Sequence, residues 1–243
     1  MKKCAFTIVD DRVYYPGGTH IFINSFKRFH PDIPLVVFRQ NTIEKVFKEK
    51  KINFYQAKPT FAKLLVKEYD LIVNMDCDHV VTGRMTEVFD KTDYDVGFPW
   101  NFNDYENAAF ENITEKMYLQ AGMVASTSKE FWDRWEEMNI RAMQYLRKEN
   151  DIVNLLVYNV MPELGLKIFD KKKDYYGCKS LGREPEFYIE DDKLMCRKEQ
   201  VLCYHHARGS TFPKLNFKAM PFRPEVKYWL EQIAFRGQTI TIL

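Results

Sequence analysis

The sequence predicts a single α/β domain with a mostly parallel, Rossmann-like central sheet flanked by helices. Strand-like and helix-like segments alternate from residue 4 to residue 81, which is typical of βαβ units with right-handed crossovers. The run from Leu71 to Met75 is almost wholly apolar, as in a strand buried on both faces. The chain has 243 residues, 46% of them hydrophobic and 15% aromatic, which is enough for one large core.

The order of the expected elements follows from periodicity and from Pro and Gly punctuation. A strand at residues 4–9 is followed by a polar turn and by a helix with Ile21 and Phe26 on its apolar face. The pattern indicates further strands at 35–38, 52–55, 71–75 (continued by 80–81), 95–98, 123–126 and 201–204, and further helices at 42–50, 58–69, 128–147, 149–160 and 224–235. Aromatic residues in the 128–147 helix are spaced as a core stripe.

The net charge and the cysteine content of the chain indicate which binding partners and which cellular compartment to expect. Thirty-six Lys and Arg against 34 Asp and Glu give a formal net charge of +2, so net charge does not indicate nucleic acid as a partner. Five cysteines without framework spacing favour a reducing compartment. No apolar run reaches the length of a membrane span, and Asp10 interrupts the first one too early for a signal peptide. We therefore expect a soluble, cytoplasmic protein.

Two phosphate-binding motifs are missing from the sequence. No G-x-G-x-x-G follows the first strand, and no G-x-x-x-x-G-K-[ST] occurs. This argues against dinucleotide dehydrogenases and P-loop enzymes. If phosphates bind, a metal ion and side chains must hold them.

The main candidate site is the Asp-x-Asp formed by Asp76 and Asp78 directly after the buried strand. Ligands of open α/β sheets bind beyond the carboxyl ends of the strands. Two carboxylates at i and i+2 of an extended chain can approach one Mn²⁺ or Mg²⁺, whose open positions phosphate oxygens fill. A second Asp-x-Asp, Asp93 and Asp95, opens a strand instead of ending one, and we interpret it as a solvated strand start.

A further candidate ligand is one of two adjacent histidines. His205 and His206 end a predicted strand and are followed by Ala207, Arg208 and Gly209. Either imidazole could bind a metal beside two carboxylates. A zinc cluster with the nearby cysteines matches no closed structural site.

Several separated motifs, in order over residues 4–215, resemble the GT-A-fold nucleotide-sugar glycosyltransferases of the glycogenin-like and lipopolysaccharide galactosyltransferase type. They are Phe61-Ala62-Lys63-Leu64, Asn74-Met75-Asp76-Cys77-Asp78, Gln120-Ala121-Gly122-Met123, Glu149-Asn150-Asp151-Ile152-Val153-Asn154 and His206-Ala207-Arg208-Gly209 with Lys214. The chain departs from the family pattern at Gln120, which replaces Asn, at Glu149 and Asn150, which replace Asp and Gln, and at Lys214, which lies two residues later.

The resemblance implies a fold, a reaction and a set of roles. It implies a single GT-A-like domain over 1–243, with a nucleotide-binding half of about 1–98 and an acceptor- and sugar-binding half of about 99–243. The implied reaction moves a sugar from a nucleotide-diphosphate donor, with a UDP-sugar favoured, to the hydroxyl of an unknown acceptor, with retention of anomeric configuration. Implied metal ligands are Asp76, Asp78 and His206 (or His205); implied donor contacts are Val9, Asp10, Asp11, Lys63, Asp76, Gly122, Gly209 and Lys214; implied catalytic residues are Gln120, Glu149, Asn150 and Asp151.

Two other interpretations stay open at this point. A haloacid-dehalogenase-like phosphatase would use Asp76 as nucleophile and Asp78 as acid and base, but its Asp-x-Asp normally ends the first strand, whereas three βα units precede this one. A catalytically silent glycosyltransferase-like binding module would be supported by a degraded metal site. Both Asp residues and His206 are present.

Overall fold

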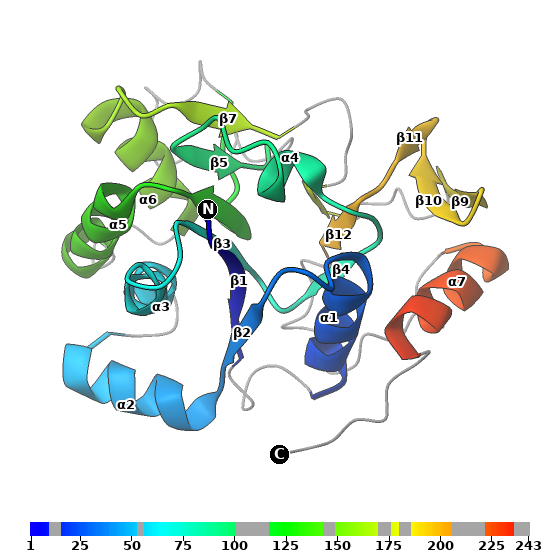
Figure 1. Ribbon diagram of the computed structural model, residues 1–243, viewed down its shortest axis with the longest axis horizontal. Coiled ribbons are helices and arrows are strands. Elements are labelled where there is room, and N and C mark those ends of the chain that lie inside the picture. The colour runs from blue at the N-terminus through cyan, green and yellow to red at the C-terminus, as the bar shows by residue number, and fades with distance from the viewer. Residues whose placement is uncertain are drawn as a thin grey trace. The chain divides into compact units, whose positions relative to one another are not determined.

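The computed structural model describes residues 1–9, 16–52, 56–100, 117–142, 149–169, 176–179, 186–205 and 222–235 (Figure 1). The chain forms two compact units, each assembled from separate segments. The first unit comprises Met1–Ile8, Pro34–Asp76 and Met85–Lys171, and the second comprises Val9–Ile33, Cys77–Arg84 and Lys172–Leu243. The division of one domain into halves near residue 98 stays a prediction.

The first unit is built on a six-stranded sheet with the order β2-β1-β3-β6-β5-β7. Parallel pairing joins β1 to β2, β1 to β3 and β5 to β7, whereas β6 is antiparallel to both of its neighbours. The predicted α/β class with a mostly parallel sheet is therefore confirmed. The strands are β1 Lys3–Ile8, β2 Leu35–Phe38, β3 Leu71–Met75, β5 Val96–Phe98, β6 Met123–Ser126 and β7 Leu166–Ile168.

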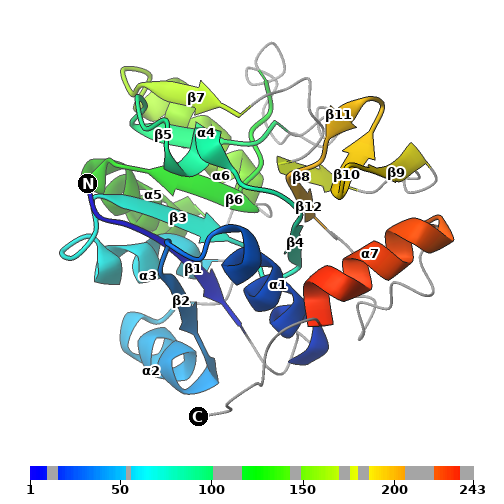
Figure 2. The same ribbon diagram turned by 45° about the vertical axis from the view of Figure 1, so that its right-hand side comes forward.

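The helices of this unit provide the rest of its core (Figure 2). They are α2 Gln40–Lys50, α3 Ala57–Leu65, α4 Thr86–Phe89, α5 Lys129–Ala142 and α6 Glu149–Leu155, which continues into the π-helical turn η4 Leu156–Val160. The predicted aromatic stripe is confirmed, because Phe131, Trp132 and Trp135 of α5 are buried; the two indole rings stack, and Phe131 meets Trp132 edge to face. Helix α3 ends before the predicted Tyr69, whose amide closes the last turn on the carbonyl of Leu65 at 3.1 Å.

The second unit has two three-stranded sheets and two helices. One sheet has the order β4-β12-β8, the other β11-β10-β9, and α1 packs against both α7 and β4. The Val81 amide of β4 donates to Ser25 Oγ of α1 at 3.1 Å, which ties this strand to the helix. The elements are α1 Pro16–Phe29, β4 His79–Val81, β8 Tyr176–Lys179, β9 Phe187–Glu190, β10 Lys193–Cys196, β11 Glu199–Gln200, β12 Cys203–His205 and α7 Pro224–Phe235.

One predicted strand is wrong in its extent. Val80 and Val81 do not continue β3, which ends at Met75; Cys77 and Asp78 form a turn, and β4 pairs antiparallel with β12 in another sheet. The bond from the Asp76 amide to the Gly122 carbonyl at 2.8 Å is the last between these two segments; the chain then turns, because the partner of β4 is β12. Residues 76–78 are therefore not the extended segment that the i, i+2 argument assumed. The strand expected at 52–55 lies largely outside the described residues.

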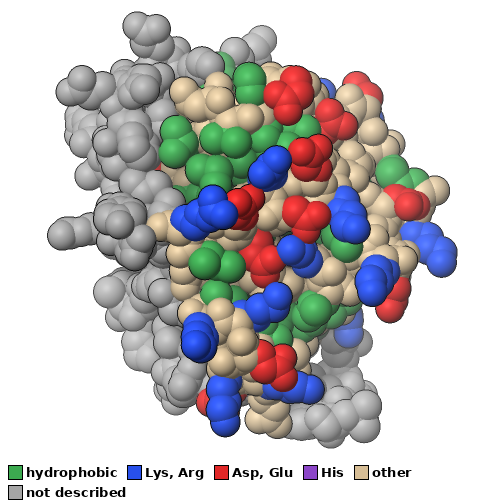
Figure 3. All heavy atoms as spheres, turned by 90° about the vertical axis from the view of Figure 1, so that its left-hand side faces the viewer, with side chains coloured by type: hydrophobic (Ala, Val, Ile, Leu, Met, Phe, Trp, Pro, Cys, Tyr) green, Lys and Arg blue, Asp and Glu red, His purple; other side chains and the backbone are tan. Residues whose placement is uncertain are grey.

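Among the described helices, none is long and apolar enough to cross a membrane. On the side of the molecule where α2, α3 and α5 lie in Figure 1, Lys and Arg side chains alternate with Asp and Glu side chains (Figure 3). This mixing agrees with the near-balanced net charge and does not form a polyanion-binding surface on the described part of that face.

Candidate functional site

A buried ionic cluster in the first unit contains Asp76, the first carboxylate of the motif. Lys58 Nζ lies 2.8 Å from Asp76 Oδ1 and 2.8 Å from Glu149 Oε2, and it donates to the Ala121 carbonyl at 2.8 Å. Lys58 comes from the first turn of α3, Asp76 follows β3, and Glu149 begins α6. One ammonium group therefore joins a helix, the end of the central strand and a second helix.

The charges of this cluster are unevenly matched. Burial would lower the pKa of Lys58, but Asp76 and Glu149 together hold it above its ordinary value. Burial raises the pKa of Glu149 to about 7; Lys58 opposes this shift, and the negative charge of Asp76 adds to it. Glu149 Oε1 is buried without a hydrogen-bond partner among the described residues. Two carboxylates share one lysine, so Glu149 retains a proton more readily than an exposed glutamate does.

The segment around Gln120 and the start of α6, two of the motifs behind the resemblance, bind each other directly. Asn150 Oδ1 accepts from the Ala121 amide at 2.9 Å, and Tyr118 donates to Asp151 Oδ1 at 2.6 Å. Asn154 accepts from the Leu119 amide at 2.8 Å and donates to the Leu119 carbonyl at 2.9 Å. These contacts use Asn150 and Asp151 to hold residues 118–121 in place.

Other predicted residues of the first unit have different surroundings. Lys63 pairs with Glu136 at 2.5 Å and Asp133 at 2.9 Å on α5. Five residues along a helix are about 140° of rotation, so Lys63 and Lys58 lie on different faces of α3. Gln120 is 2% exposed, and its backbone N–H donates to the Pro99 carbonyl at 3.0 Å. The Gly122 carbonyl accepts the hydrogen bond from the Asp76 backbone N–H.

The second carboxylate, Asp78, belongs to a separate cluster in the second unit. Its Oδ1 lies 3.2 Å from His205 Nε2 and 4.0 Å from His79 Nδ1. The two imidazole rings stack with centroids 4.2 Å apart and an interplanar angle of 7°, because His79 and His205 are direct partners in the β4–β12 pairing. One ligand atom from each of the three residues lies within 4.8 Å of the others.

The electrostatics of this cluster favour an ionised carboxylate. Burial would raise the pKa of Asp78, but His205 and His79 lower it to about 2. Both histidines are buried, at 6% exposure for His205 and 0% for His79. A carboxylate with two imidazoles is a donor set that binds divalent transition metals well. The three residues therefore fit a divalent cation.

Several predicted residues lie outside the described part of the chain: Asp10, Asp11, His206, Gly209 and Lys214. Val9 is described and fully buried just after β1. Of the two histidines predicted as alternative metal ligands, the structure describes His205, which lies beside Asp78.

Sequence reasoning missed Lys58 and His79. Lys58 was interpreted only as the start of a helix, although it precedes the strand of the Asp-x-Asp. His79 belongs to none of the motifs, and a residue next to Asp78 in an extended chain would face away from it; only the turn at Asp78 brings the two side chains together.

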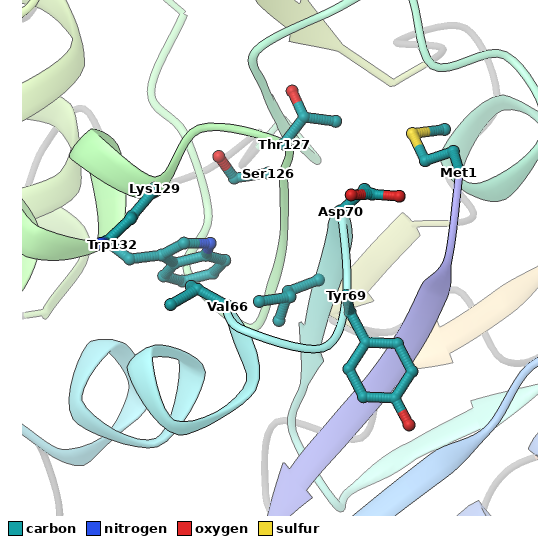
Figure 4. A pocket seen from close by; sticks show the side chains of 9 residues that line it. Met1, Val66, Tyr69, Asp70, Ser126, Thr127, Lys129 and Trp132 are labelled. Atoms are coloured by element: carbon teal, nitrogen blue, oxygen red, sulfur yellow. The ribbon is translucent and has the colours of Figure 1, made fainter.

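A pocket of about 240 Å³ in the first unit shares no lining residue with these clusters (Figure 4). Its lining includes Asp70, Ser126 and Trp132. Asp70 precedes β3 and Ser126 ends the antiparallel β6, so the pocket is at the amino end of β3, whereas Asp76 is at the carboxyl end. None of the predicted site residues lines it.

No protein-family model and no curated protein matches the sequence. Solved structures do match. The galactosyltransferase LgtC, in complex with donor and acceptor sugar analogs, is 15% identical with a TM-score of 0.51, over 95% of this chain and 94% of that one. The glycosyltransferase GlyE of Streptococcus pneumoniae TIGR4 is 12% identical with a TM-score of 0.59, over 98% of this chain and 61% of that one.

A third similar structure is a glycosyltransferase involved in glycosylation of the major capsid of PBCV-1, which is 11% identical with a TM-score of 0.53, over 86% of this chain and 100% of that one. The chain therefore has the GT-A-like fold that these glycosyltransferases share, and the resemblance drawn from the sequence is confirmed at the level of the fold. The structures do not favour the phosphatase interpretation.

Proposed function

We propose that the protein is a metal-dependent glycosyltransferase that moves a sugar from a nucleotide-diphosphate donor to an acceptor hydroxyl, with retention of configuration. The observation that carries the proposal is the place of the Asp-x-Asp. In a GT-A-like fold, it follows the central strand, and Asp78 lies within ligand distance of His205. This combination supports a cation on the donor diphosphate.

Asp78 and His205 would hold the cation, Mn²⁺ or Mg²⁺, and Asp76 remains a predicted ligand. When bound, the cation would stabilise the negative charge that develops on the diphosphate as the anomeric C–O bond breaks. Lys58 would fix Asp76 and the Ala121 carbonyl in one arrangement. Its three short contacts support that positioning role.

The remaining roles come from the resemblance. Glu149 and Gln120 would face the sugar, and Asn150 and Asp151 would position residues 118–121 beside it. The other proposed donor contacts are Val9, Asp10, Asp11, Lys63, Gly122, Gly209 and Lys214, with His206 as an alternative metal ligand. A UDP-sugar is the favoured donor. We leave the acceptor open.

Donor binding tests this proposal. Thermal or chemical unfolding is followed with UDP, other nucleoside diphosphates and their sugars, each with and without Mn²⁺. A nucleotide at one hundred times its dissociation constant should add about 2.7 kcal/mol to the unfolding free energy, and only when Mn²⁺ is present. Release of the free nucleotide diphosphate from the stabilising nucleotide sugar would then measure turnover.

The chain contains two Asp-x-Asp motifs, so an aspartate of the second motif provides a control for Asp78. Asp78→Ala should abolish the metal-dependent stabilisation, whereas Asp93→Ala, in the exposed second Asp-x-Asp, should leave it unchanged. If no nucleotide stabilises the protein, or if Asp78→Ala binds as the wild type does, the proposed metal–diphosphate site is wrong. Binding without turnover would indicate a binding module instead.

A further inference from the structure

We propose that His79 is a third protein ligand of the cation, and that the site therefore prefers a transition metal such as Co²⁺ or Zn²⁺ to Mg²⁺. The inference rests on the proposed function, which places a cation at Asp78 and His205. It adds a residue that neither the sequence motifs nor the similar structures assign. It also gives the site a metal preference.

The position of His79 follows from local backbone structure. Neighbouring residues of an extended strand point to opposite faces, so Asp78 and His79 would diverge if β3 continued through them. Asp78 instead lies in a turn, and His79 is the first residue of β4. This change of direction lets both side chains reach one point.

Strand pairing brings the second imidazole to the same point. His79 is directly opposite His205 in the antiparallel β4–β12 ladder, and the rings are nearly parallel at 7°. Stacked rings present their edges side by side, so a nitrogen of each can face the same carboxylate. Asp78 Oδ1 lies 3.2 Å from His205 Nε2 and 4.0 Å from His79 Nδ1.

These separations are close to those of a metal site. Ligand atoms each about 2.1 Å from one cation are about 3 to 3.4 Å apart in octahedral or tetrahedral geometry. The His205–Asp78 distance already falls in this range. His79 Nδ1 would have to approach Asp78 Oδ1 by less than about 1 Å. A cation lies in the plane of each imidazole that binds it, so one of the two stacked rings would also turn about its Cβ–Cγ bond when the cation binds.

Two imidazoles change which cation is preferred. Mg²⁺ takes oxygen ligands and gives up its water reluctantly, so replacing oxygen by nitrogen ligands gains it little. Imidazole suits Zn²⁺, Co²⁺ and other first-row transition metals, whose affinities follow the Irving–Williams order. A carboxylate flanked by His79 and His205 should therefore discriminate strongly against Mg²⁺.

The test titrates the nucleotide-free protein with Co²⁺ and, separately, with Mg²⁺ in a calorimeter. His79→Phe keeps a planar ring against His205 but removes the nitrogen ligands. It should weaken Co²⁺ binding at least about tenfold and change Mg²⁺ binding less than about threefold. His30→Phe, which replaces another fully buried histidine of the same unit, should leave both affinities unchanged.

A spectroscopic readout accompanies the titration. Cu²⁺ bound to the wild type should show the hyperfine pattern of one more equatorial nitrogen than Cu²⁺ bound to His79→Phe. If His79→Phe fails to fold, His79→Asn takes its place with the same expected losses. Unchanged Co²⁺ affinity and nitrogen count in the folded variant would overturn the inference.

Two further variants separate this inference from the proposed function. If Asp78→Asn and His205→Phe weaken Co²⁺ binding but His79→Phe does not, the cation site stands and the role of His79 is wrong. If none of the three weakens it, the cation at Asp78 is itself wrong.

Discussion

The two aspartates of a single motif lie in clusters of opposite character. Asp76 is in a cluster that contains its own cation, because Lys58 Nζ lies 2.8 Å from both Asp76 and Glu149. Asp78 is flanked by two imidazoles, whose nitrogens can act as ligands of an added cation. One residue, Cys77, separates the two. The residue types of a motif therefore do not determine the surroundings of its carboxylates. The local direction of the backbone determines which cluster each carboxylate joins.

The pKa values of the two clusters show the same difference. Glu149 and Asp78 are both buried, which raises the pKa of any carboxyl group. Burial raises the pKa of Glu149 to about 7, because Lys58 only partly opposes the shift and the negative charge of Asp76 adds to it. Asp78 falls to about 2 because His205 and His79 both favour its charged form. The first cluster thus has two carboxyl groups for one lysine, and the second stabilises the negative charge of Asp78.

The largest loss of unfolding free energy is expected when the first cluster loses its lysine. Lys58→Met keeps most of the side-chain volume but leaves the buried Glu149 and the partly exposed Asp76 without their cation. Loss of one partner of a buried ion pair costs about 3 to 5 kcal/mol, which denaturant unfolding at pH 8 would measure. The loss should shrink at pH 5, where the carboxyl groups can take up protons.

Lys63→Met is the matched control for this change. It removes a lysine from the same helix, but one whose side chain is 33% exposed beside Glu136 and Asp133. Solvent screens the partly exposed Lys63 and Asp133, and the buried Glu136 keeps the hydrogen bond from the Thr60 hydroxyl, so the expected loss is smaller, about 1 kcal/mol. Equal losses in the two variants would show that the Lys58 cluster is no more important to stability than a surface pair.

The sequence predicted several elements well because their signals are local and repeated. The continuous apolar run at Leu71 to Met75, the strand at 35–38 and the helix at 224–235 are observed with the predicted bounds. In each case, hydrophobic periodicity or a Pro boundary determines the element without help from distant residues.

The details of the site depend on contacts that periodicity does not encode. Nothing local distinguishes Lys58 from Lys63 on α3, because the choice depends on where Asp76 and Glu149 arrive from other elements. The turn at Asp78 likewise follows the last bond between β3 and the chain before β6, from the Asp76 amide to the Gly122 carbonyl, almost fifty residues later. Sequence reasoning placed the two carboxylates correctly in the chain but assumed the wrong backbone between Asp76 and Asp78.

A smaller expected effect tests how the first cluster is held in place. Asn154 forms two bonds with the Leu119 backbone and donates to the Asn150 carbonyl at 2.7 Å. Asn154→Ala leaves buried peptide groups unpaired, which should cost about 2 to 4 kcal/mol in denaturant unfolding. Asn139→Ala is the control, since Asn139 is equally buried but its side-chain amide has no hydrogen-bond partner among the described residues. A larger loss in Asn139→Ala would contradict the assigned role of Asn154.

The last expected effect is a pH dependence of the unfolding free energy that comes from the first cluster. The raised pKa of Glu149 means that between its ordinary value of 4.5 and about 7 the folded protein holds a proton that the unfolded chain has released. The unfolding free energy should therefore fall as pH rises through this window, by at most about 1.4 kcal/mol per pH unit from this group. Glu149→Gln cannot titrate, so its unfolding free energy should fall less steeply across the same window. Parallel profiles for wild type and variant would mean that Lys58 keeps Glu149 fully ionised and that the cluster is balanced after all.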